Sequence, residues 1–129
     1  MSYTAEEQAN LDLVAGLFRE VLNPMDSAAV DRFIDPGYIQ HSQLAPPGRD
    51  ALKSFLDMIK GASPQAVHDV KRMFADGDHV IVHYHVRRWK DDTGMAVMDI
   101  FRIADGLIAE HWDVSMDVPV GGPNPNSPF

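Results

Sequence analysis

The sequence predicts a single α+β domain in which the helices come first and an antiparallel sheet follows. Apolar residues recur at helical spacing as far as Lys60, whereas after Pro64 they alternate with polar residues as strands do. Asp-Gly turns separate several of the alternating runs, which is typical of hairpins between neighbouring antiparallel strands. We expect one domain over residues 1–117 and an irregular tail, rich in Pro, Gly and Asn, over residues 118–129.

Three helices are expected, between residues 4 and 23, over 27–34 and over 49–60. Thr4 with Glu7 three residues later forms a capping-box pattern at the first helix start. Pro24 ends this helix because proline disfavours helical geometry in the residue before it. The Asp35-Pro36-Gly37 break ends the second helix, and Gly61 is the expected C-cap of the third.

Four strands are expected, at residues 67–74, 79–89, 96–103 and 107–114. The tripeptide Ala-Asp-Gly joins the first to the second and the third to the fourth, which indicates repeated turn chemistry. Residues 38–42, between the second and third helices, are expected to be extended or loop. Helices packed on one face of a curved sheet follow from this order of elements.

Composition excludes several functional classes. The 129 residues carry a net charge of −8, which argues against nucleic acid as a partner. No cysteine is present, so disulfides and thiolate chemistry are excluded. The first residues lack the basic end and apolar core of a signal peptide, and no apolar run approaches a membrane span, so we expect a cytoplasmic protein. Phosphate-binding glycine loops, nucleophilic serine motifs and dinucleotide fingerprints are also missing from the sequence.

The hairpin over residues 96–115 is the most informative stretch. It contains four groups that can carry charge or exchange a proton: Asp99, Glu110, His111 and Asp113. The turn decides which of them share a face. A two-residue turn would set Asp99 opposite Trp112, whereas a three-residue turn would set it opposite His111.

We favour the three-residue turn because it gathers the apolar side chains of the hairpin on one face. That face would hold Met98, Ile100, Ile108 and Trp112. The opposite face would then hold Asp99, His111 and Asp113 among Val97 and Phe101. This arrangement is an acid–base cluster on an apolar background.

Several short words in the sequence resemble one known family. They are Tyr38-Ile39-Gln40-His41, Gly77-Asp78-His79-Val80, Asp99-Ile100-Phe101-Arg102 and the run from Asp105 to Val114, which contains His-Trp-Asp. From about Phe18 to Phe129 the chain resembles the SnoaL-like group of the nuclear-transport-factor-2-like superfamily. This group includes polyketide cyclases and proteins described as predicted aldol-condensation enzymes. The resemblance implies a cone of three helices against a strongly curved, mainly antiparallel sheet with an internal pocket.

The resemblance also implies a role for one residue. Asp113 matches the aspartate that serves as acid–base catalyst in polyketide cyclases of the group. Those cyclases often have a histidine on the neighbouring strand, where this sequence has Asp99. Two carboxylates that face one pocket hold a shared proton more readily than one carboxylate beside a histidine.

Two functions are consistent with these residues. The first is an enzyme in which Asp113, helped by Asp99 and by His111 or His41, moves protons next to a carbonyl group in cyclisation, isomerisation or dehydration, with no cofactor. The second is a non-catalytic protein whose pocket binds a small hydrophobic acid or carbonyl compound. Either pocket would be lined by Tyr38, Phe18, Leu52, Phe55, Val97 and Phe101.

The histidines of the sequence do not predict a metal site. His79, His83 and His85 alternate on the strand face opposite the apolar one, which points them toward solvent or a subunit contact. His41, His111, Asp99 and Asp113 would offer suitable ligands. Nothing in their spacing requires a metal, so none is expected.

The apolar face of the hairpin predicts self-association. All three helices are needed on the pocket side, so Met98, Ile100 and Trp112 would remain in water as a large apolar patch, flanked by Arg102 and Glu110. We therefore expect a homodimer that packs sheet on sheet, with Trp112 near its centre.

Overall fold

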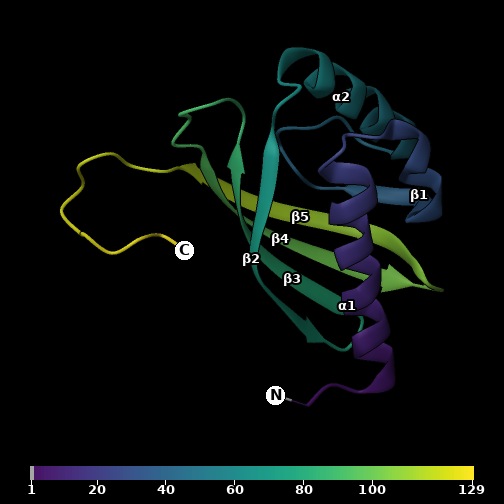
Figure 1. The fold of residues 1–129 in the computed structure, drawn as a ribbon. Helices are drawn as coiled ribbons and strands as arrows, with labels where there is room; N and C mark the ends of the chain where they lie inside the picture. The colour runs from purple at the N-terminus through teal and green to yellow at the C-terminus, as the bar shows by residue number, and fades with distance from the viewer. Residues whose placement is uncertain (1) are drawn as a thin grey trace.

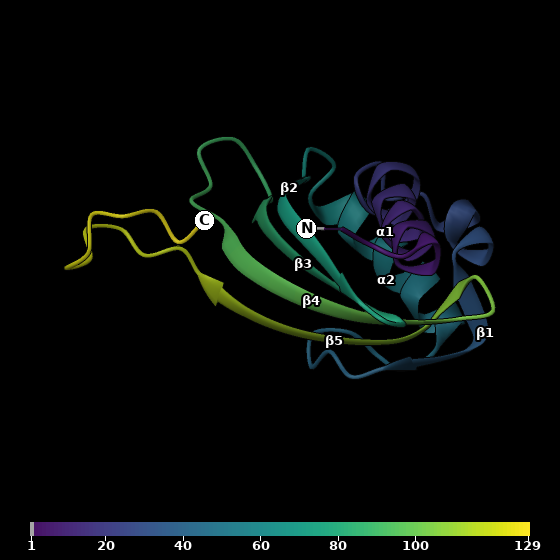
Figure 2. The ribbon, with the colours of Figure 1, turned by 90° about the horizontal axis from the view of Figure 1, so that it is seen from below.

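The computed structural model describes residues 2–129, and its strands form one curved sheet in the order β1-β5-β4-β3-β2. The strands are β1 (Ile34–Gln40), β2 (Val67–Asp76), β3 (His79–Arg87), β4 (Met95–Ala104) and β5 (Leu107–Asp117). All neighbours are antiparallel except β1, which is parallel to β5. Figures 1 and 2 show the sheet bending around the helices, which lie on its concave side. The expected α+β cone is confirmed.

The first helix begins as the sequence predicts. α1 (Ala5–Leu17) is capped by Thr4, whose Oγ1 accepts from the Glu7 N–H while the Glu7 carboxylate accepts from the Thr4 N–H. The helix continues as a π-helical turn, η1 (Phe18–Leu22), and stops before Pro24. No helix within residues 2–129 is long and apolar enough to span a membrane.

The other two helices differ in part from the expectation. The second is a 3₁₀-helix, η2 (Ser27–Arg32), which Asp26 caps through its side chain. The third, α2 (Arg49–Ala62), passes through Gly61, so the predicted C-cap at Gly61 is wrong and Ser63 follows the helix instead. Gly61 is absent from the positive-φ residues, so here glycine is accepted as an ordinary helical residue.

The strand β1 was predicted only in part, because residues 38–42 were expected to be either extended or loop. Residues expected to end the second helix and to break the chain instead form an edge strand that pairs with β5. The pairing is irregular between Ile34 and Ile39, where Pro36 lies. Proline lacks the N–H that a central strand needs but is tolerated at an edge or an irregularity. The lack of strict alternation around Pro36 explains why the sequence pattern did not show the whole of this strand.

The β4–β5 register corrects the predicted turn. Asp105 and Gly106 form a two-residue turn with φ values of 52° and 76°, typical of a type I′ hairpin, so the expected three-residue turn is wrong. Ala109 is an additional residue in β5, because Ile103 pairs with Ile108 and Arg102 pairs with Glu110. Beyond this bulge, the strands are offset by one residue from the register that the turn alone would give.

The bulge decides which side chains share a face. Asp99 lies opposite Asp113 rather than opposite His111 as expected, and His111 lies opposite Phe101. All four project from the concave face, so the predicted grouping is correct although the register is not. Ile108 was expected on the convex face, but it is fully buried because it precedes the bulge and pairs with Ile103.

The core fills the space between α1 and the concave sheet face. Its fully buried apolar side chains are Val14, Val21, Val30, Ile34, Val80, Val82 and Ile108. Phe18 packs edge-on against Tyr84 and Phe101, with ring centroids 5.0 and 6.4 Å apart. This packing closes one end of the cone and leaves the other end, beneath α2, available for a cavity.

The convex face carries the alternating histidines of β3, as the sequence pattern predicts. Val80 and Val82 point into the core between them. Residues 118–129 contain no helix or strand, and they turn back toward the sheet. The Phe129 ring stacks on His85 at 4.4 Å and lies 5.5 Å from the His83 ring. These histidines therefore contact the tail.

Gly94 lies at the end of the β3–β4 connection, and a substitution there tests how closely that connection is packed. A Cβ at this position would overlap the backbone oxygen of Val86, and its φ of +76° also disfavours an L side chain. Gly94→Ala should lower the free energy of unfolding by more than about 2 kcal/mol. Gly77→Ala is the matched control, because Gly77 has a φ of +58° but open space around its Cβ position.

That control should cost about 1 kcal/mol, the strain of the left-handed backbone alone. Urea unfolding measures both values. Equal losses in the two variants would contradict the assigned close contact at Gly94.

Candidate functional site

A cavity of about 410 Å³ lies between α2 and the concave face of the sheet. Its wall is mostly apolar, and α2 contributes one side of it. Of the wall residues expected from the sequence, those that line the cavity are Tyr38, Leu52, Phe55, Val97 and Phe101. The size and the apolar character suit a small organic ligand.

Two of the expected site residues lie elsewhere. Phe18 is only 3% exposed and belongs to the core, where it packs behind the cavity against Tyr84 and Phe101. His41 is on the convex side: its Nε2 lies 2.7 Å from a Glu110 carboxylate oxygen, and its ring stacks on Trp112. The expectations that these two side chains face the cavity are therefore wrong.

The placement of His41 follows from the continuation of β1. Gln40 pairs with His111 on β5 and extends the strand, so successive side chains point to opposite faces. Gln40 and Ser42 consequently face the cavity, and His41 between them faces outward. Strand alternation takes every second residue from Tyr38 and would have identified Gln40 and Ser42. Neither residue was predicted from the sequence.

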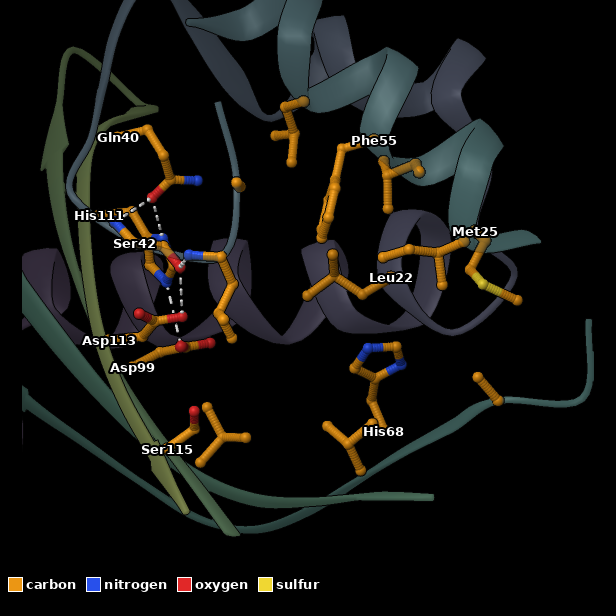
Figure 3. Close-up of a pocket in the computed structure, with 18 of the residues that line it drawn as sticks. Leu22, Met25, Gln40, Ser42, Phe55, His68, Asp99, His111, Asp113 and Ser115 are labelled. Atoms are coloured by element: carbon orange, nitrogen blue, oxygen red, sulfur yellow. Dashed lines mark hydrogen bonds and ion pairs between the residues drawn. The ribbon is translucent and has the colours of Figure 1, made fainter. Parts of the chain in front are cut away.

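The polar end of the cavity contains the predicted cluster of Asp99, His111 and Asp113 (Figure 3). Asp99 from β4 is 2% exposed, and His111 from β5 is 8% exposed. One donor atom from each of the three lies within 4.8 Å of the others. Three ionisable groups thus meet at one end of an otherwise apolar cavity.

Gln40 fixes the tautomer of His111. The Gln40 Oε1 atom accepts from the backbone N–H of Ser42 at 3.1 Å, which identifies it as the amide oxygen. It also lies 2.7 Å from His111 Nδ1, so Nδ1 must carry the proton that it donates. In a neutral imidazole, His111 Nε2 is then the unprotonated nitrogen.

This tautomer requires a proton between His111 and Asp99. His111 Nε2 lies 3.0 Å from Asp99 Oδ1, and an unprotonated nitrogen beside a carboxylate would leave two lone pairs in contact. Either the imidazole is protonated or the carboxyl group is. The angle is poor for a hydrogen bond, so both atoms are buried without a well-aligned partner among the described residues. The pair therefore holds a proton that a ligand could realign.

Burial raises the pKa of Asp99 above its ordinary value, because the carboxylate form loses its hydration. The close contact and charge of His111 act in the opposite direction, as does the hydroxyl of Tyr84, while the nearby Asp113 carboxylate raises the pKa further. The net direction is upward, so Asp99 is the carboxyl group of the site that favours the protonated form.

Asp113 has a different environment from Asp99. Its side chain is half-buried, and Ser42 Oγ donates a hydrogen bond to its Oδ2 at 2.9 Å. Asp113 and Asp99 are direct cross-strand partners, which places their Cβ atoms about 5 Å apart. Two carboxyl groups with unequal environments side by side are suited to different roles in proton transfer.

The same three side chains could also supply ligands to a metal ion. Asp99, His111 and Asp113 offer two oxygen donors and one nitrogen donor, and Nε2, the unprotonated nitrogen of a neutral His111, faces Asp99. Such a set suits zinc or another first-row divalent ion. No metal was expected from the sequence, and the acid–base chemistry of the cluster requires none.

Comparison with known proteins identifies a protein-family model that matches the sequence and solved structures that share the fold. A model of the SnoaL-like domain matches residues 14–111. No curated protein matches the chain in sequence. The matched segment contains all of α2 and β1 to β4 and reaches His111 in β5.

Solved structures share this architecture at low sequence identity. A candidate SnoaL-like polyketide cyclase from Jannaschia sp. CCS1 is 21% identical, with a TM-score of 0.75 over 89% of this chain and 90% of that one. A candidate polyketide cyclase from Acidithiobacillus ferrooxidans is 20% identical, with a TM-score of 0.71 over 89% and 91%. IdmH, a candidate polyketide cyclase from Streptomyces antibioticus, is 22% identical, with a TM-score of 0.66 over 82% and 91%.

Asp99→Asn tests the cost of the buried carboxylate. Because the folded pKa of Asp99 is raised, the folded state holds this proton to higher pH than the unfolded state, and stability falls as pH rises through the folded pKa. An asparagine amide could donate to His111 Nε2 without a charge. The variant should therefore be more stable than wild type at pH 8, by about 1–2 kcal/mol, and equally stable near pH 3.

Chemical denaturation at the two pH values measures this difference. Asp113→Asn is the matched control, because Asp113 is half-buried and accepts a hydrogen bond from Ser42. It should change stability less at pH 8. A loss of stability in Asp99→Asn at pH 8 would show instead that the ionised pair is net stabilising.

Proposed function

The chain belongs to the family of SnoaL-like domains, and we propose that it is a small-molecule enzyme that moves protons at a carbon next to a carbonyl group. The observation that carries this proposal is the proton-sharing pair of Asp99 and His111 beside Asp113, at the polar end of an apolar cavity. A carboxyl group with a raised pKa, such as Asp99, beside a second carboxyl group is characteristic of acid–base sites.

Asp113 is the proposed base. Its carboxylate would take the proton from the carbon next to the carbonyl, and the C–H electron pair would form the C=C bond of an enolate. Ser42 holds one carboxylate oxygen, which leaves the other to face the substrate. Asp113 is half-buried at the cavity wall, where a ligand can contact it.

The Asp99–His111 pair is the proposed electrophile. The substrate's carbonyl oxygen would accept a hydrogen bond from the proton that the pair shares, and this bond would strengthen as negative charge develops on the oxygen. The side chain of Gln40 holds His111 in place, and the backbone N–H of Ser42 in turn donates to Gln40. The donor is thus positioned before the substrate binds.

The same enolate supports three outcomes without a cofactor. Attack of its carbon on a second carbonyl forms the C–C bond of an aldol cyclisation, and the resulting alkoxide takes back the proton from Asp113. Return of the proton to a different carbon is an isomerisation. Loss of a β-hydroxyl as water is a dehydration, in which the leaving oxygen takes the proton from Asp113 as the C–O bond breaks. The Asp113 and Asp99–His111 roles are identical in all three, so the substrate decides between them.

The alternative is a non-catalytic protein whose cavity binds a small hydrophobic carbonyl compound or acid. The lining supports this reading too, because an apolar cavity with a few convergent polar groups binds ligands without reacting with them. The two functions differ in what Asp113 does: it changes the rate in one and only the affinity in the other.

Asp113→Asn separates the two functions with 1-tetralone as a model ketone. An enzyme of the proposed kind should accelerate exchange of the hydrogens at carbon 2 of 1-tetralone with D₂O. The variant should lose this acceleration by roughly 10²–10⁴-fold, while its affinity for 1-tetralone changes by less than about threefold. Proton NMR measures the exchange, and titration of the protein signals measures the affinity.

Asp50→Asn is the matched control, because the Asp50 side chain at the start of α2 is exposed and does not line the cavity. It should leave the exchange within about twofold. An unchanged exchange rate in Asp113→Asn, or a loss of affinity alone, would contradict the enzyme and support the binding protein.

We also propose that the convex face mediates a homodimer. Exposed apolar side chains line it along β4 and β5: Met98, Ile100, Val114 and Met116, which are 39%, 36%, 72% and 52% exposed. Trp112, the expected centre, is half-buried between the rings of His41 and His79. The proposed contact therefore centres on Met98 and Ile100.

Met98→Glu should convert the dimer to monomers, because it places a charge in the proposed contact. Sedimentation at micromolar concentration measures the mass. Met58→Glu is the matched control, since Met58 on α2 is 61% exposed and lies away from the convex face. A wild-type protein that sediments as a monomer would contradict the dimer.

A further inference from the structure

His68 is a second polar group in the cavity, and neither the sequence pattern nor the proposed reaction uses it. It lies on β2, at the sheet edge farthest from β5, in register with Val86 of β3. Figure 3 shows its ring across the cavity from Asp99, His111 and Asp113. The cavity therefore has polar groups at two separate places on its wall.

The protein holds His68 in place but gives its ring nitrogens no hydrogen-bond partner among residues 2–129. The backbone N–H of His68 donates to Asn23 Oδ1 at 2.8 Å, and the ring packs 6.0 Å from Tyr84 and 6.5 Å from Phe18. Neither ring nitrogen makes a hydrogen bond with any of residues 2–129. Packing fixes the orientation of the His68 ring, and its ring nitrogens keep their capacity to form hydrogen bonds.

The two nitrogens of His68 are not equivalent. Nδ1 is fully buried with no partner, whereas Nε2 is not among the fully buried atoms and keeps contact with open space. A buried N–H without a partner is rarer and costlier than a buried acceptor without one. The ring proton therefore belongs on Nε2, where a ligand oxygen can accept it.

The end of the cavity near His68 carries little charge. Burial lowers the pKa of His68 to about 4, so the imidazole is neutral near pH 7. The arginine in the wall, Arg88, is occupied by Asp92, with hydrogen bonds of 2.8 and 3.1 Å to the two carboxylate oxygens. An incoming carboxylate would find no free cation among the described wall residues.

We propose that His68 is a specificity-determining residue that donates a hydrogen bond to a neutral oxygen at the end of the substrate remote from the reacting carbonyl. The substrate class is then a hydrophobic, uncharged compound with two oxygen groups, a carbonyl for the Asp99–His111 pair and a hydroxyl or second carbonyl for His68. This assignment rests on the proposed function, since that function places the reacting carbonyl. It narrows the ligand from an acid or carbonyl compound to a neutral carbonyl compound.

The sheet sets the length of such a compound. β2 and β4 are separated by β3, so their backbones are on the order of 10 Å apart. His68 is in register with Met95 of β4, four residues from Asp99, which adds an offset of roughly 13 Å along the strands. Tyr84 of β3 lies between, with its ring beside His68 and its hydroxyl toward Asp99. A ligand that reaches both ends would lie across the Tyr84 ring, which favours a flat ring system of two or three fused rings.

Three ketones test the assignment with the intact protein. 1-Tetralone has only the carbonyl, 6-hydroxy-1-tetralone adds a hydroxyl at the opposite ring edge, and 6-carboxy-1-tetralone adds a carboxylate there. Wild type should bind the hydroxyl compound roughly fivefold more tightly than 1-tetralone, the gain of one neutral hydrogen bond, and the carboxylate more weakly than either. NMR titration measures the three dissociation constants.

His68→Leu should abolish the preference for the hydroxyl compound and leave the affinity for 1-tetralone within about twofold. His68→Gln, which keeps a side-chain N–H donor, should retain part of the preference. His68→Leu should also unfold at the same or a higher denaturant concentration, because it removes a buried unpaired nitrogen. A purely structural histidine would instead lose stability and leave the preference intact.

The outcomes separate this assignment from the proposed function. Equal binding of 1-tetralone and 6-hydroxy-1-tetralone by wild type, or a preference that survives in His68→Leu, overturns the role of His68 alone. A preference that depends on His68 while Asp113→Asn leaves exchange unchanged overturns the proposed function and supports His68 as a binding residue. No binding of either compound by wild type contradicts both.

Discussion

The site depends on one additional residue in a strand. Ala109 lies in β5 without a partner in β4, and its presence changes which side chains of β5 face the cavity. A two-residue turn without the bulge would send His111 and Asp113 to the convex face and bring Trp112 opposite Asp99. Because the bulge shifts the register by one residue, the two-residue turn is compatible with a cluster that faces the cavity. The burial of Asp99, and with it the proton shared with His111, follows from this local irregularity.

The edge strand β1 completes what the bulge begins. It is the parallel partner of β5, and it brings Gln40 beside His111 and Ser42 beside Asp113. Gln40 determines which imidazole nitrogen faces Asp99, and Ser42 occupies one oxygen of Asp113. Both are neutral residues that carry no catalytic signal by themselves. Their contribution is to give two similar carboxyl groups different surroundings.

The sequence was sufficient for the fold and for the composition of the cluster. The change from helical to alternating periodicity located the sheet, and parity along two strands grouped Asp99, His111 and Asp113 correctly. Pairing depends on tertiary contacts that periodicity does not encode, which is why the register was not predicted and the strand β1 was predicted only in part. His41 was assigned to the cavity from its place after the second helix in the resembled fold, and Phe18 was assigned as part of the expected apolar wall. Their actual faces depend on β1 and on how tightly α1 packs.

His68 was not predicted as a site residue for a similar reason. On β2 it follows Val67 and precedes Asp69, and an isolated histidine in such a run is compatible with either face. Its position against Phe18 and Tyr84 is a consequence of how α1 crosses the sheet edge. Asn23, the residue directly after the π-helical turn, accepts a hydrogen bond from the His68 backbone N–H. A helix irregularity thus positions a residue on a neighbouring strand.

The strand order also has a consequence for solubility. The sheet has two edge strands, β1 and β2, and β2 is the longer of them, with ten residues against seven. An unpaired strand edge can recruit another chain and start aggregation unless charge or irregularity blocks it. β2 has both: Lys71 and Arg72 are exposed, and its pairing with β3 shifts between Val70 and Arg72. Ordered fibre growth from this edge is therefore disfavoured, and two copies of the chain can meet through their faces without joining their sheets into one.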